Sequence, residues 1–205
     1  MWTKQDDSYW IQKEKDLRKS LVSFEGHGFL IERKKKKRKK NWKGLIRKEV
    51  LEALLKARAQ LPEGLDIKIY DGWRSWALQK EVSGSCKKKL RVLFPKWTEK
   101  EIVERQFQLA PPIRIVPKFD SHRYGGAFDV TLVYKNGKEV NMGTPVGSRA
   151  GEIANLLYFH LKEKLTGKEK VYLKNRTILI DAMSKAGFQP YLREFWHWNY
   201  EFQVR

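Results

Sequence analysis

The sequence predicts an α+β fold in a single domain, with a central antiparallel sheet and helices packed around it. Two kinds of apolar spacing support this prediction. Some stretches repeat apolar residues every three or four positions, as amphipathic helices do, and shorter stretches alternate apolar and polar residues, as half-buried strands do. The Lys-Asn-Gly-Lys sequence at 135–138 adds a hairpin turn between two strands.

The first 43 residues form a predicted N-terminal extension, and residues 44–205 form the predicted domain proper. Within the extension we expect a short helix over 9–21 and a strand-like piece over 29–32. A run of basic residues over 32–43 follows. Such runs repel themselves and are normally solvated loops or linkers.

The first half of the domain is expected to supply a helix, a strand and two more helices. Apolar residues at helical spacing predict a helix over 44–60, and alternation predicts a strand over 65–70. Two further helices are expected over 75–82 and 99–108. The last of these begins at a capping box, Thr98 with Glu101, and stops before Pro111 and Pro112.

Two strands in the second half are predicted to carry the function. The β-forming stretch 127–134 should place Asp129 on the face of Ala127, Thr131 and Val133. Residues 196–203 alternate strictly between aromatic and polar side chains, with His197 on the polar face. Between these strands, helices are expected over 149–165 and over 174–186, the second capped by Gly187.

Two distant segments, DSHRYGGAFD at 120–129 and EFWHW at 194–198, hold the residue types of a catalytic zinc site. His122, Asp129 and His197 offer two imidazoles and a carboxylate as ligands, and Glu194 is a spare carboxylate that can act as a base. The glycines at 125 and 126 allow the backbone to turn between the first two ligands.

Each of these residues also has a structural interpretation. A single histidine on a mixed strand is usually structural, Asp129 can be a turn or capping residue, and Glu194 can be a surface charge. The combination favours a metal site, because the chain has four histidines and two lie in such contexts. His160 lies in the helical pattern 149–165 and His27 between two glycines, so both are fallback ligands only.

The two segments resemble the zinc D-alanyl-D-alanine dipeptidases of the vancomycin-resistance type, within the wider group of D,D-carboxypeptidases and related endolysins. The matching motifs are His-x-x-Gly-x-Ala-x-Asp and Glu-x-Trp-His, together with IYDGWRS at 69–75, DVTLVY at 129–134, NMGTPV at 141–146 and AGFQPYLREFWHW at 186–198. The resemblance covers residues 45–205 and implies a fold of the D,D-peptidase and hedgehog type.

The resemblance implies one zinc ion per chain, bound by His122, Asp129 and His197. It implies Glu194 as the catalytic base and Arg74 as the group that stabilises the developing oxyanion. The rigid fork of donors on an arginine suits that role. The alternative for Arg74 is a structural ion pair, for example with Asp71.

Two departures from the family pattern concern the substrate. The family has Ser two positions before the first histidine ligand, where this chain has Asp120, and it has Asp after its MGTPF turn, where this chain has Gly147. We hypothesise that Asp120 replaces the missing carboxylate and binds the ammonium group of the substrate. Ser121 and Asp71 are further candidates for substrate binding.

Composition limits the classes of protein to consider. The 205 residues suit one domain with a real core, and Cys86 is the only cysteine, so neither an internal disulfide nor a cysteine zinc site can form. No stretch has the length and apolar character of a membrane span, and the charged N-terminus does not resemble a signal peptide. We therefore expect a cytoplasmic location.

The net charge of +19 arises from 43 Lys and Arg against 24 Asp and Glu. We expect no specific nucleic-acid partner, although the basic residues 34–40 can make weak contact with a polyanion.

The leading functional hypothesis is hydrolysis of the D-alanyl-D-alanine dipeptide. The alternatives are a D,D-carboxypeptidase or endopeptidase acting on longer peptidoglycan stem peptides and, in a different class, a polyanion-binding protein that uses residues 34–40. Residues 87–108 are a candidate lid over the site.

Overall fold

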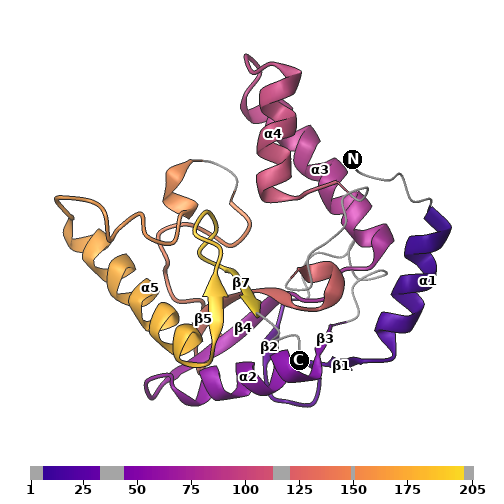
Figure 1. Cartoon of the computed structure of the whole chain (residues 1–205). Helices are drawn as coiled ribbons and strands as arrows, with labels where there is room; N and C mark the ends of the chain where they lie inside the picture. Colours follow the sequence, from indigo (N-terminus) through magenta and orange to yellow (C-terminus); the bar gives the residue numbers. More distant parts are fainter. Residues whose placement is uncertain (1–6, 33–43, 113–120, 149–150, 201–205) are drawn as a thin grey trace.

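A computed structural model describes residues 7–32, 44–112, 121–148 and 151–200 (Figure 1). The helices are α1 (Asp7–Arg18), α2 (Lys48–Ala59), α3 (Trp76–Leu93), α4 (Glu99–Leu109) and α5 (Gly167–Lys185), with short 3-10 turns η1 (His122–Tyr124) and η2 (Glu152–Ala154). The strands are β1 (Leu21–Ser23), β2 (Leu30–Ile31), β3 (Leu45–Arg47), β4 (Leu65–Asp71), β5 (Ala127–Tyr134), β6 (Phe188–Pro190) and β7 (His197–Tyr200).

The main sheet has five strands in the order β2-β4-β5-β7-β6, so β5 lies at its centre. The pairs β4–β5, β5–β7 and β6–β7 are antiparallel, but the edge strand β2 runs parallel to β4. The fold is therefore mixed α and β, consistent with the α+β prediction, and the prediction of a purely antiparallel sheet is wrong at this edge. Strands β1 and β3 form a separate antiparallel pair.

One face of the main sheet supports the principal core. Ile67, Ile69, Val130 and Leu132 are fully buried there, in one cluster with apolar residues of α2 and α5. Figure 1 shows both helices along the lower side of the sheet. Each such side chain contributes about 1.5–3 kcal/mol when it leaves water. Phe24 and Phe29 join this cluster, so part of the N-terminal extension belongs to the core.

Helices α3 and α4 form a hairpin with a small core of its own. Leu78, Val82, Cys86 and Leu90 recur every four residues along α3 and make one buried stripe. Ile102 and Ala110 of the α4 segment complete this cluster. In Figure 1 the hairpin extends away from the sheet, and the connection between its helices lies at the far end.

Several sequence predictions are confirmed. Strands β4 and β5 match the predicted ranges 65–70 and 127–134, and α4 begins at the predicted capping box, in which Thr98 and Glu101 exchange hydrogen bonds. Helix α1 ends at Arg18, three residues before the predicted end. Helix α3 continues to Leu93, well beyond the predicted end at 82.

Other predicted elements have different bounds. The segment predicted as a helix over 44–60 begins with β3, and its helix starts only at Lys48. The 135–138 turn forms, but its second strand is reduced to one bridge between Val133 and Glu139. Strand β7 covers 197–200, and residues 201–203 of its predicted range lie outside the described residues, as does the basic run at 33–43.

The helix predicted over 149–165 is wrong: residues 151–165 form turns and the short η2. Arg176 of α5 explains the irregular path. Its guanidinium is fully buried and donates to the carbonyl oxygens of Met142, Ile153 and Asn155, which holds this segment against α5. Helix α5 starts at Gly167 rather than 174, because Thr166 and Glu169 form a second capping box.

Within the described residues, no helix combines the length and apolar character needed to cross a bilayer.

Candidate metal centre

The register of the two central strands places Asp129 beside His197. Asp129 of β5 lies directly opposite His197 of β7, and residues that are directly opposite point to the same face of a sheet. The face that they share is the one away from the α2–α5 core. Alternation had placed Asp129 on the face of Ala127, Thr131 and Val133 and His197 on the polar face of its strand, and the register brings these two faces together.

His122 comes from the loop before β5. Gly125 adopts a left-handed conformation with φ of 70°, and its N–H donates to the His122 carbonyl, which closes the tight turn after η1. A Cβ at position 125 would lie 2.8 Å from a methyl carbon of Leu21, so both backbone and space favour glycine. The N–H of Arg74 also donates to the His122 carbonyl, which connects this loop to the end of β4.

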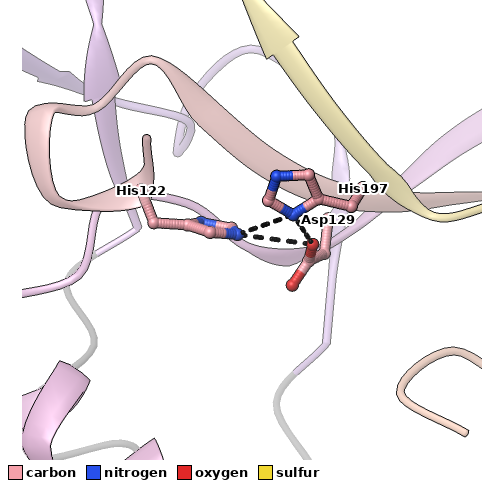
Figure 2. A group of neighbouring side chains, drawn as sticks. All are labelled: His122, Asp129 and His197. Carbon is pink, nitrogen blue, oxygen red and sulfur yellow. Dashed lines mark hydrogen bonds and ion pairs between the residues drawn. The ribbon is translucent and has the colours of Figure 1, made fainter. Parts of the chain in front are cut away.

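The three side chains converge on one point (Figure 2). Nε2 of His122 lies 3.2 Å from Nδ1 of His197, and Oδ1 of Asp129 lies 3.4 Å from the first nitrogen and 3.1 Å from the second. Ligand atoms that bind a tetrahedral zinc ion at about 2.0–2.2 Å lie about 3.3–3.6 Å from one another. The observed triangle therefore has nearly the size of one face of such a tetrahedron.

Hydrogen bonds on the outer nitrogens set the tautomers of both imidazoles. Nδ1 of His122 lies 2.7 Å from the Gly72 carbonyl oxygen, which only accepts, so this nitrogen donates. Nε2 of His197 likewise donates to Oδ1 of Asn199 at 2.9 Å. The remaining nitrogen of each neutral ring then directs a lone pair toward the Asp129 carboxylate. Outer partners of this kind orient metal-bound histidines.

The charges at this point favour a cation. Two lone pairs and a carboxylate oxygen within 3.4 Å repel one another unless a proton or a metal ion lies between them. Burial lowers the pKa of His122, which favours the neutral ring. Burial also lowers the pKa of His197, but the hydrogen bond and the charge of Asp129 outweigh this effect and raise it. His122, Asp129 and His197 thus form a cluster that can hold a metal ion.

A β-bulge turns Asp71 toward the same face. Ile69 lies opposite Val130 and Asp71 lies opposite Asp129, so the register shifts between Ile69 and Asp71. In a regular strand Ile69 and Asp71 would share the core face. The bulge instead directs the Asp71 carboxylate to the face of the metal cluster, as bulges near active sites often do.

Arg74 connects Asp71 to the cluster. Its Nε donates to Oδ2 of Asp71 at 2.9 Å, and its Nη2 donates to Oδ2 of Asp129 at 3.0 Å. Burial lowers the pKa of Arg74, but the charges of Asp71 and Asp129 outweigh this effect and raise it. Asp129 therefore directs one oxygen to the imidazoles and the other to a permanent positive charge. The expected alternative, an ion pair between Arg74 and Asp71, is present.

Glu194 lies beside the cluster without belonging to it. Its side chain is buried, and its charge raises the pKa of Arg74, His197 and Tyr191. Its carbonyl oxygen accepts from the N–H of His197 at 3.0 Å, in the turn that leads into β7. Among the described residues, the ligand cluster contains only His122, Asp129 and His197.

The other candidates have separate outcomes. Asp120 lies outside the described residues. Ser121 directly precedes His122, and its hydroxyl oxygen is buried without a hydrogen-bond partner in the described part of the chain. His27 lies in an exposed turn, and His160 contacts the Thr177 hydroxyl, so neither joins the cluster.

Sequence reasoning missed two groups that orient the imidazoles, the Gly72 carbonyl and the Asn199 side chain. The alternation of β7 already placed Asn199 on the face of His197, so this residue could have been found.

A comparison with protein-family models found no match for the chain, and a comparison with curated proteins found none either.

Proposed function

We propose that this protein is a zinc-dependent peptidase that hydrolyses the D-alanyl-D-alanine dipeptide. One observation carries the proposal: two imidazoles and a carboxylate converge at 3.1–3.4 Å, with a buried glutamate and an arginine beside them. A purely structural metal site needs neither a spare carboxylate nor a cationic donor. The substrate follows from the motif resemblance, and so does a fold of the D,D-peptidase and hedgehog type.

Zinc suits the donor set. Two neutral imidazole nitrogens and one carboxylate oxygen are a common set of protein ligands in catalytic zinc sites, which leave a fourth position for water or substrate. When bound, zinc lowers the pKa of a coordinated water to about 7 and polarises the scissile carbonyl. Asp129 also contacts Arg74, which holds its carboxylate in one orientation.

Glu194 is the proposed general base. It takes a proton from the attacking water and later delivers that proton to the nitrogen of the leaving D-alanine. The charge of Glu194 acts on Arg74, which places the two groups near each other in the site. Because the carboxylate is buried, its proton transfers take place away from bulk water.

Arg74 is the proposed oxyanion donor. Its Nε and Nη2 are engaged by Asp71 and Asp129, which fix the guanidinium plane. We assign Nη1, which neither of these carboxylates binds, to the substrate oxygen. A donor that acts only on the charge of the transition state contributes about 3 kcal/mol. Asp71 then positions Arg74 rather than binding the substrate.

The decisive assay is the release of D-alanine from purified protein given D-alanyl-D-alanine or a longer stem peptide, each with and without a chelator. We expect release from the dipeptide that stops with the chelator and returns with zinc. Release from the stem peptide alone would identify a D,D-carboxypeptidase instead. Absence of release from both substrates with zinc present would refute the peptidase assignment and favour the polyanion-binding alternative.

Glu194→Gln tests the assignment of the base. We expect kcat to fall by about 10²–10⁴-fold while the bound zinc stays at the wild-type level. Glu104→Gln, an exposed change on α4 with the same chemistry, is the matched control and should leave kcat unchanged. Turnover at the wild-type rate in the Glu194 variant would rule out its role as the base.

A further inference from the structure

The end of the α3–α4 hairpin exposes apolar side chains. Val92 is 80% exposed, Leu93 46% and Trp97 36%, although the apolar stripe of α3 is fully buried as far as Leu90. Single exposed apolar residues are ordinary on protein surfaces. Three of them within six residues, at the end of a projecting hairpin, form a distinct patch, which we call the hairpin tip (residues 92–97).

The hairpin tip is ordered rather than frayed. Glu99 forms ion pairs with Lys87 and Arg91 of α3, which hold the start of α4 against the end of α3. The ring of Trp97 stacks on Phe94 with centroids 3.9 Å apart, and the Thr98 capping box fixes the first turn of α4. The apolar side chains are therefore held outward by a defined turn.

Four lysines lie close to these residues in the sequence. Lys88, Lys89, Lys96 and Lys100 are all exposed, and none forms an ion pair with another described residue. Two acidic groups close to these lysines are engaged, because Glu99 pairs with α3 and Glu101 belongs to the capping box, and Glu104 lies one turn further along α4. The hairpin tip thus combines a projecting apolar end with four exposed lysines.

We propose that the hairpin tip docks on the surface of an anionic lipid bilayer. Val92, Leu93 and Trp97 would enter the interfacial region, where tryptophan side chains are favoured, and the lysines would contact anionic headgroups. A convex tip of three side chains is too small for a specific protein partner, which covers about 800 Å² on each side. Nucleic acid would match the lysines but not the aliphatic side chains. This proposal does not depend on the proposed peptidase activity.

A fluorophore at the tip tests the contact directly. Cys86 is the only cysteine and is buried, so a Val92→Cys variant can be labelled at one place with an environment-sensitive dye. With vesicles of phosphatidylcholine and about 30% phosphatidylglycerol, the dye should brighten and shift to the blue, and pure phosphatidylcholine should have little effect. Val171→Cys on α5, also exposed, is the matched control. Equal responses at both positions, or none at position 92, would overturn the proposal.

Co-sedimentation with the same vesicles separates the tip from the basic run. Changing Val92, Leu93 and Trp97 to Ser should lower partitioning at least about tenfold, as should changing the four lysines to Gln. Changing the exposed Leu161, Val171 and Leu192 to Ser should have no such effect. Thermal melts show that each variant is folded. If deletion of residues 34–40 abolishes binding and the tip variants bind like wild type, the basic run is the membrane contact and the proposal fails.

Discussion

The sheet that carries the candidate metal ligands and the α3–α4 hairpin beside it each have a core of their own, but the two cores relate to the site differently. In the sheet, Val130 and Leu132 are buried on one face of β5, while Asp129 faces the metal position from the same strand. In the hairpin, the stripe from Leu78 to Leu90 forms one cluster with Ile102 of α4 and with Ala110, which follows α4. The site and the sheet core thus share a backbone, whereas the described links between the hairpin and the site region lie at the base of the hairpin.

This difference predicts that changes in the two cores have separate effects on stability and on metal affinity. A change in the sheet core shifts strands that hold ligands, so stability and metal affinity should fall together. A change in the hairpin core should loosen α3 and α4 and leave the ligands in place. The two regions are linked where α3 follows Arg74 and where the hydroxyl of Tyr191 donates to the Gln108 carbonyl oxygen of α4.

The largest expected effect comes from cavities in the two cores. Leu132 and Leu90 are both fully buried, and removing such a side chain costs about 2–5 kcal/mol. Leu132→Ala should lower the global free energy of unfolding and the zinc affinity together. Leu90→Ala should speed amide exchange within α3 and α4 and leave zinc affinity unchanged. Urea denaturation measures the stability of both variants, hydrogen exchange measures the local opening, and zinc titration measures the affinity. Equal loss of exchange protection throughout the chain in both variants would contradict the predicted separation of the two cores.

Two glycines offer a sharper version of this comparison. A Cβ at Gly72 would lie 2.6 Å from the Phe24 ring and 2.7 Å from the Leu45 carbonyl oxygen, so Gly72→Ala should destabilise the fold by about 1–3 kcal/mol. It should also weaken zinc binding, because the Gly72 carbonyl holds His122. Gly84 of α3 has open space around it, and Gly84→Ala should stabilise by about 0.5–1 kcal/mol. Chemical denaturation of both variants checks this pair, and a stable Gly72→Ala protein would mean that the backbone there is less confined.

Asn199 provides a smaller, local test. Removing the group that accepts a hydrogen bond from a metal-bound histidine costs about 10–100-fold in metal affinity. Asn199→Ala should show that loss in a zinc competition assay, with its melting temperature near that of wild type. Asn199→Asp keeps an acceptor for Nε2 of His197 and should retain most of the affinity. If both variants bind zinc like wild type, the orientation of His197 does not depend on this contact.

The smallest effect is expected at the start of α5, far from both cores. Hydrogen bonds from Lys162 and from the backbone N–H of Thr166 lower the pKa of Glu169 from 4.5 to about 2. A lowered pKa in the folded state stabilises the protein above about pH 4.5, and this contribution disappears as the pH falls toward 2. Glu169→Gln should therefore be slightly less stable than wild type at pH 7, with the difference closing between pH 4.5 and 2. Glu163→Gln, an exposed neighbour, should show no such closure in the same melts.

The central part of the site could be predicted from sequence because it follows from strand periodicity. Alternation placed Asp129 on the face of Ala127, Thr131 and Val133 and His197 on the polar face of its strand, and antiparallel pairing in register brings these two faces together. The glycines after His122 predicted the turn that returns this side chain to the strand. The ion pair between Arg74 and Asp71 was predicted only as the alternative to an oxyanion role for Arg74, and it is present.

Other features depend on tertiary contacts that local patterns do not encode. The bulge before Asp71 breaks the alternation from which the face of that residue would be inferred. The apolar spacing at Ile153, Leu156 and Leu157 is typical of a helix. The guanidinium of Arg176 instead donates to carbonyl oxygens of this segment and holds it in turns. The Gly72 carbonyl contacts His122 across 50 residues, so no spacing rule reveals it.

Zinc titration of the metal-free chain tests the central claim most directly. We expect one zinc ion per chain, with binding that weakens as the pH falls, because protons compete for the imidazole nitrogens that face Asp129. Asp129→Ala should lose this binding while circular dichroism shows a folded protein. A folded wild-type chain that retains no zinc, or an Asp129→Ala variant that binds one equivalent as tightly as wild type, would contradict the account.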